Sequence, residues 1–120
     1  MKKKVLLIDD HDDFRAILKD YLNQQDLDLV IFEANSAAMG AIKASCVKPD
    51  IILMDISLPN PSGLETVRQI IKDLPRCAII ILTLFDVAVF KKLTKRIKVK
   101  AFIGKNEVYE KLLPLIKKCL

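Results

Sequence analysis

Five polar or charged side chains follow short apolar runs of this sequence. They are Asp9 and Asp10 after 5–8, Asp55 after 51–54, Thr83 after 78–82, and Lys105 shortly after 101–103. The runs have the look of strands that are buried on both faces. In an open parallel sheet the carboxyl ends of the strands share one edge, and ligands bind there. We therefore expect these side chains to converge on one site.

The residue types indicate chemistry on a phosphoryl group. Three carboxylates in one crevice repel one another and need a cation or protons to coexist. Oxygen ligands of this kind favour Mg²⁺, with Mn²⁺ as a possible substitute. Opposite a metal ion, the Lys105 ammonium and the Thr83 hydroxyl suit phosphoryl transfer, with Asp55 as the nucleophile. We expect His11, next to the acidic pair, to face solvent.

Other readings of these residues have weaker support. The chain has three glycines and neither a GxxxxGK[ST] loop nor a GxGxxG motif. A phosphatase with an aspartate nucleophile would need a second acid two residues further on, where this chain has Ser57. A long-lived aspartyl phosphate is therefore predicted rather than rapid hydrolysis. The acids could also cap helices, and we expect one of the acids at 9–13 to cap the first helix.

The elements that must position these residues alternate along the chain. Strand-like runs occur at 5–8, 29–32, 51–54, 78–82 and 101–103. Helix-spaced apolar stripes lie between and after them: Phe14, Ile17, Leu18, Tyr21 and Leu22; Ala38, Ala41 and Ile42; Leu64, Val67, Ile71 and Leu74; Phe90, Leu93 and Ile97; Val108, Leu112, Leu115 and Cys119. Ser36 and Asp86 are expected N-caps, and Pro114 is expected to kink the last helix. This order predicts a three-layer α/β/α sandwich, (βα)5, around a five-stranded parallel sheet.

The composition fits one domain over residues 1–120. Of the 120 residues, 52% are hydrophobic and 29% charged, which excludes a disordered chain. No apolar run approaches the roughly 20 residues of a membrane span, and the run after the N-terminal lysines is too short for a signal peptide. We therefore expect a cytoplasmic protein without a membrane partner.

The three cysteines have no CxxC spacing, and with one histidine they do not support a zinc site. Reduced thiols in or near the core are expected. Residues 91–100 hold six basic residues within the net charge of +5, and we interpret them mainly as a solvated helix face. The alternative is a patch that binds an acidic partner surface.

Four stretches together resemble the receiver domain of bacterial two-component response regulators. They are VLLIDDHDDFR, KPDIILMDISLPNPSGLE, IIILT and AFIGK, and the resemblance covers all 120 residues. "DDH", "PSGLE" and Asn106 resemble the NarL/LuxR-type receivers in particular. The resemblance implies a flavodoxin-like sheet with strand order 2-1-3-4-5. It also implies a histidine kinase as phosphodonor, and a protein that is not an enzyme beyond its own phosphotransfer and slow dephosphorylation.

The resemblance also assigns roles to single residues. It implies that Asp55 is the phosphoacceptor, and that Asp9, Asp10, Asp55 and the Ser57 backbone carbonyl hold Mg²⁺. Thr83 would bind the phosphoryl group, Lys105 would pair with it, and Phe102 would be the switch aromatic. The face formed by the fourth helix, fifth strand and fifth helix would then change, and could form a homodimer or control an output domain in transcription regulation.

Two departures from the family pattern leave an alternative open. Leu84 stands where a small residue is typical, and it could restrict access to Asp55 or pack aside. Asn106 replaces a common proline, so we expect a trans bond after Lys105. These departures are the support for a phosphorylation-independent docking or dimerisation module. NarL/LuxR-type members continue into a helix-turn-helix domain that binds DNA, so the chain is expected to be a fragment of a longer regulator or a stand-alone receiver.

Overall fold

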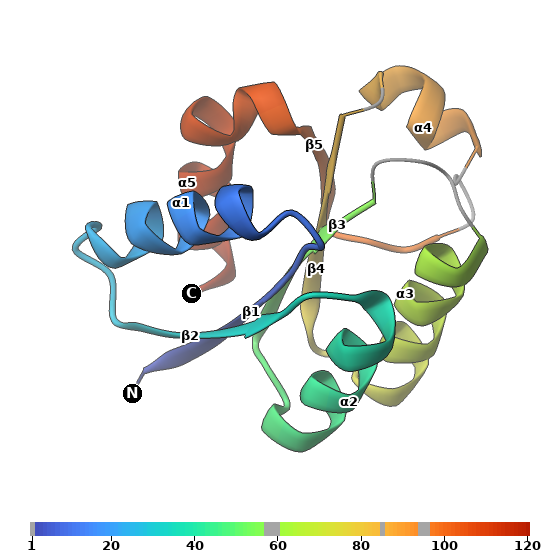
Figure 1. The fold of residues 1–120 in the computed structure, drawn as a ribbon, viewed down its shortest axis with the longest axis horizontal. Helices are drawn as coiled ribbons and strands as arrows, with labels where there is room; N and C mark the ends of the chain where they lie inside the picture. The colour runs from blue at the N-terminus through green and yellow to red at the C-terminus, as the bar shows by residue number, and fades with distance from the viewer. Residues whose placement is uncertain (1, 57–60, 85, 94–96) are drawn as a thin grey trace.

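The chain folds as five strands alternating with helices. The computed structural model describes residues 2–56, 61–84, 86–93 and 97–120. Its elements are β1 (Lys3–Ile8), α1 (Asp12–Asn23), β2 (Leu29–Ala34), α2 (Ala37–Val47), β3 (Ile51–Asp55), α3 (Pro61–Asp73), β4 (Ala78–Thr83), α4 (Val87–Leu93), β5 (Ala101–Gly104), a 3-10 turn η1 (Lys105–Glu107) and α5 (Val108–Cys119) (Figure 1). The predicted order of elements is confirmed.

The strands form one parallel sheet in the order β2-β1-β3-β4-β5. Figure 1 shows α1 and α5 on one face of the sheet and α2, α3 and α4 on the other. This is the three-layer sandwich that the alternation predicted, with the flavodoxin-like order that the resemblance implied. The helix that follows β1 and the helix that precedes β3 thus lie on opposite faces of the sheet, so the carboxyl ends of β1 and β3 flank the crevice where ligands bind.

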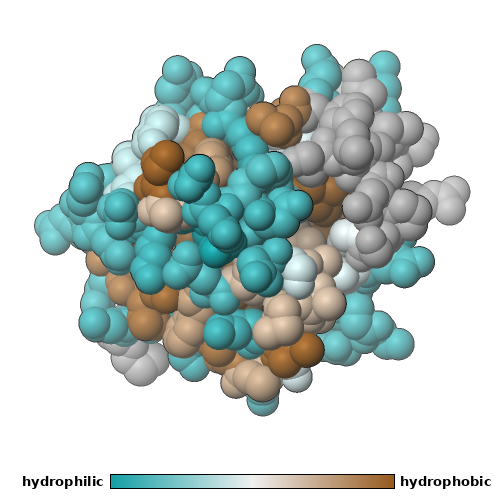
Figure 2. Space-filling view, in the orientation of Figure 1, coloured by the Kyte–Doolittle hydropathy of each residue, from teal (hydrophilic) through white to brown (hydrophobic). Residues whose placement is uncertain are grey.

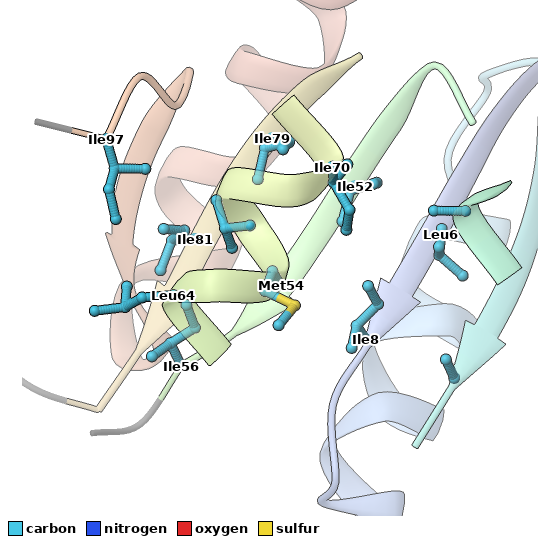
Figure 3. Packing of buried hydrophobic residues seen from close by; sticks show 13 residues of the cluster. Leu6, Ile8, Ile52, Met54, Ile56, Leu64, Ile70, Ile79, Ile81 and Ile97 are labelled. Carbon is cyan, nitrogen blue, oxygen red and sulfur yellow. The ribbon is translucent and has the colours of Figure 1, made fainter. Parts of the chain in front are cut away.

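The central strands are apolar throughout because helices cover both of their faces. Leu53 and Leu82 belong to the core under α1 and α5, while Met54 and Ile81 belong to the opposite core. Figure 3 shows this second core, with α3 lying over the side chains of β3 and β4. The four apolar residues 51–54 of β3 are each at most 2% exposed. A strand held this firmly on both sides fixes the position of the residue at its end.

The predicted apolar face of α2 is wrong. Its buried residues are Gly40 and Ala44, whereas Ile42 is 58% exposed and Ala38 is exposed too. The reason is close packing: a Cβ atom at Gly40 would lie 2.5 Å from Cδ1 of Ile8. Small residues therefore face the sheet, and larger apolar ones remain outside, where Figure 2 shows a tan and brown area over α2.

The other local expectations hold in part. The Ser36 side chain accepts a hydrogen bond from the Met39 amide, so it caps α2 as predicted. Ile97, predicted to lie on the apolar stripe of the fourth helix, is buried but lies beyond the end of α4. Pro114 was expected to kink the last helix, and α5 continues through it. Cys46 is exposed, because it lies on the outer side of α2, so its expected place in or near the core is wrong. Within the described residues, the helices are all too short or too polar to cross a membrane.

Candidate functional site

The predicted residues meet at the carboxyl edge of the sheet. Asp9 follows β1 and Asp55 is the last residue of β3, and these strands pair side by side up to Ile8 and Met54. Lys105 begins the turn after β5, two strands away. Parallel pairing of β1, β3, β4 and β5 thus brings together residues that are up to 96 positions apart, as the sequence predicted.

Lys105 lies between two buried carboxylates. Its Nζ atom is 3.1 Å from Oδ2 of Asp9 and 3.1 Å from Oδ1 of Asp55. The side chains of Asp9, Asp55 and Lys105 are only 6%, 4% and 6% exposed. Nζ also lies 4.4 Å from the centre of the Phe14 ring, a distance suited to a cation–π contact. One ammonium group thus pairs with two carboxylates that are largely shielded from water.

The carboxyl group of Asp55 is held in an unfavourable place for a negative charge. Burial raises its pKa above the ordinary value, and the charge of Asp9 raises the pKa further. Lys105 lowers it through a hydrogen bond and its positive charge, but does not cancel the rise. A further cation at this edge would relieve the repulsion.

The loop after β1 is tied down by contacts that the sequence reasoning did not assign. The His11 amide donates to Oδ1 of Asp9 at 2.8 Å, and Arg15 Nη1 donates to the Asp9 carbonyl at 2.6 Å. Arg15 in turn pairs with Glu33 on β2 at 3.1 Å. The sequence feature that could have indicated this role is the position of Arg15, in the first turn of the helix that follows the acidic pair. These bonds fix the orientation of the Asp9 carboxylate.

No acid caps α1, contrary to expectation. The N-cap residue is His11, and it makes no side-chain cap hydrogen bond. Asp9 is turned toward Lys105, while Asp12 pairs with Arg15 at 2.8 Å within the first turn. The acids at the start of α1 thus act on the site or through the helix dipole, rather than as caps.

His11 is exposed, as expected, but one edge of its ring is directed into the site. Its side chain is 52% exposed, yet Nδ1 lies 3.1 Å from Oδ1 of Asp9 and 3.2 Å from Oδ1 of Asp10. The same atom is 3.5 Å from Oδ2 of Asp55. The exposed edge of the ring faces solvent, and its Nδ1 edge meets the carboxylates.

The donor set fits a divalent cation. Oδ2 of Asp9 is buried without a hydrogen-bond partner, although the Lys105 ammonium is near. Asp9, Asp10, His11 and Asp55 each offer one ligand atom, and these atoms lie within 4.8 Å of one another. A buried carboxylate oxygen that shares its one ammonium with a second carboxylate, among further carboxylate oxygens, is the environment that hard divalent ions occupy. Ser57, the fourth predicted metal ligand, lies outside the described residues.

The two predicted switch residues lie on the same side of the sheet. Thr83 is fully buried at the end of β4, and Phe102 packs against the core under α3. Phe102 pairs in register with Ile81, and Thr83 follows two residues later on the same face of β4. Phe102 and Thr83 therefore lie on the same face of neighbouring strands, and their switch role stays a prediction.

Leu84 and Asn106 take defined positions. Leu84 is 68% exposed and lines a hollow of about 770 Å³ together with His11, Phe14 and Lys105. It stands at the approach to the acidic site and does not pack into the core. The bond between Lys105 and Asn106 is trans, as predicted, and continues into the 3-10 turn.

The chain matches a known protein family. The family model described as response regulator receiver domain matches residues 5–117. The response regulator protein VraR of Staphylococcus aureus is 40% identical over 85 residues, which are 71% of this chain but 41% of VraR. The matched segment thus spans less than half of that relative.

Two solved structures have the same fold. A LuxR-family two-component response regulator from Aurantimonas sp. SI85-9A1 has a TM-score of 0.84 and 24% identity, over 98% of this chain and 84% of that one. The response regulator TrrA from Thermotoga maritima, solved in complex with Mg²⁺-BeF, has a TM-score of 0.85 and 26% identity over the whole of both chains.

Proposed function

Because the chain belongs to the response regulator receiver domain family, we propose that it accepts a phosphoryl group on Asp55 from a histidine kinase. The observation that carries this proposal is the buried Asp55 carboxylate at the end of β3, held 3.1 Å from the Lys105 ammonium, which it shares with the buried Asp9 carboxylate. A nucleophile with a fixed cation on one side and a cation site on the other suits phosphoryl transfer.

The chain's own residues perform most of the step. An Asp55 oxygen attacks phosphorus, the bond from phosphorus to the kinase imidazole breaks, and its electron pair stays on that imidazole. Lys105 pairs with the phosphoryl oxygens as negative charge gathers there. Asp9 and Asp10 would hold Mg²⁺, together with Asp55 and the Ser57 carbonyl. When bound, that ion neutralises the charge of the incoming group.

The new group would be read out through Thr83 and Phe102. A phosphoryl group adds about −1.5 to −2 charge and strong acceptor oxygens, which would draw the Thr83 hydroxyl and Lys105 toward Asp55. Phe102 would move into the space that Thr83 leaves. The face of α4, β5 and α5 would then change its preferred partner, either a second copy or an output domain that regulates transcription. Such a chain is a cytoplasmic signalling module rather than a turnover enzyme.

The direct test is the mass of the intact protein after incubation with Mg²⁺ and acetyl phosphate. We expect a phosphate-sized adduct that is lost in Asp55→Asn and when EDTA replaces Mg²⁺. Asp20→Asn is the matched control, because it makes the same atomic change at an exposed site on α1. Beryllofluoride should shift the NMR signals of Thr83 and Phe102. A protein that gives neither adduct nor shifts would instead be a phosphorylation-independent docking module.

A further inference from the structure

The imidazole of His11 lies at the centre of the acidic site. Nδ1 is within 3.1–3.5 Å of oxygens from Asp9, Asp10 and Asp55, and 3.3 Å from Nζ of Lys105. A ring nitrogen carries either one proton or one lone pair, so it cannot satisfy three carboxylates and an ammonium at once. Nδ1 therefore belongs to a set of possible metal-ligand atoms that converge on one point.

The backbone holds His11 in this place. Its amide donates to Oδ1 of Asp9 at 2.8 Å, and its carbonyl accepts from the Arg15 amide at 3.0 Å in the first turn of α1. The side chain makes no cap hydrogen bond to the helix, so capping does not account for its direction. The side chain is 52% exposed, so the ring stands at the solvent boundary of the site, with its Nδ1 edge toward the carboxylates.

We propose that Nδ1 of His11 is a ligand of the divalent ion at this site, and that it shifts the site's preference from Mg²⁺ toward first-row transition-metal ions such as Mn²⁺ and Co²⁺. Imidazole suits these ions, whereas Mg²⁺ prefers oxygen ligands alone. The four donor atoms lie within 4.8 Å of one another, close to the roughly 4.4 Å that separates opposite ligands at bond lengths near 2.2 Å. The inference rests on the metal site of the proposed function.

The chain has one histidine, which makes a spectroscopic test specific. In tag-free protein loaded with Mn²⁺, electron spin echo modulation should show a coupled imidazole ¹⁴N nucleus. Labelling the histidine ring with ¹⁵N should replace that signal without any mutation. His11→Gln should abolish the signal and weaken Co²⁺ and Mn²⁺ binding on the order of tenfold, measured by titration calorimetry. Its affinity for Mg²⁺ should stay within about twofold.

The outcomes separate this inference from the proposed function. Mn²⁺ binding that is lost in Asp9→Asn, but shows no imidazole nitrogen in the unmutated protein, would overturn the role of His11 and leave the phosphoacceptor site intact. An unchanged Co²⁺ to Mg²⁺ preference in a folded His11→Gln protein would overturn it as well. Failure of every divalent ion to bind would refute the metal site itself, and with it the Mg²⁺-dependent step.

Discussion

Replacing Lys105 with methionine tests how the two buried carboxylates are stabilised. Methionine keeps an unbranched chain of similar length but removes the ammonium that lies 3.1 Å from both Asp9 and Asp55. At an effective dielectric constant of about 20, each such contact amounts to roughly 5 kcal/mol before desolvation is subtracted. The desolvation of the ammonium offsets several kcal/mol, and breaking a buried pair typically costs about 3–5 kcal/mol.

We expect the free energy of unfolding in EDTA to fall by about 3–5 kcal/mol, measured by urea denaturation. This is a large share of the roughly 5–15 kcal/mol of a typical domain. In saturating Mg²⁺ the loss should be smaller, because the ion compensates the carboxylates in place of the ammonium. An ion at about 100 times its dissociation constant adds roughly 2.7 kcal/mol to either protein, so the loss shrinks by the amount by which the variant, without the ammonium, binds Mg²⁺ more tightly.

The control is Lys111→Met, which removes an ammonium that is 56% exposed and paired with Glu107 on the helix surface. That change should cost less than about 1 kcal/mol, with no dependence on Mg²⁺. The reasoning is refuted if Lys105→Met is as mild as the control. It is also refuted if the loss is equal in EDTA and in Mg²⁺, since a charge deficit must respond to a cation.

Three further predictions concern packing, capping and thiol chemistry. Gly40→Ala should destabilise the protein by about 1–3 kcal/mol in urea, because its Cβ would press on Ile8, and Ile8→Val in the same chain should recover part of that loss. Ser36→Ala should lower stability by about 1 kcal/mol through the lost α2 cap; an unchanged urea midpoint would contradict this. Burial raises the pKa of Cys77 to about 12, so at pH 8 a thiol reagent should label exposed Cys46 quickly and Cys77 slowly; equal rates would contradict this.

Much of the fold could be predicted because the strands carry a strong local signal. Apolar runs bounded by acids or turn residues are typical of buried parallel strands, and their carboxyl ends must share an edge. The gathering of Asp9, Asp55 and Lys105 followed from that rule alone. The strand order did not follow from that rule, because hydrophobic periodicity does not indicate which strands are neighbours. The order was predicted from the family resemblance.

The errors arose where packing distance decides the outcome. The α2 face was misassigned because hydrophobicity favours Ile42, whereas the buried residues are Gly40, which lies too close to Ile8 for a side chain, and Ala44. His11 is exposed as predicted, but the contact of its Nδ1 atom with the carboxylates was missed, because a single histidine in a turn carries no periodic signal. Its position depends on a backbone bond to Asp9, which is a property of the folded loop.

The wide sequence separation of the site residues has a consequence for folding. Lys105 contacts Asp9 and Asp55 only after β5 has joined β4, which itself must pair with β3. Contacts of this range form late, since the loops between them must close first. A nascent or partly folded chain therefore lacks the complete acceptor site. Under the proposed function, only a chain whose whole sheet has assembled would be able to accept the phosphoryl group.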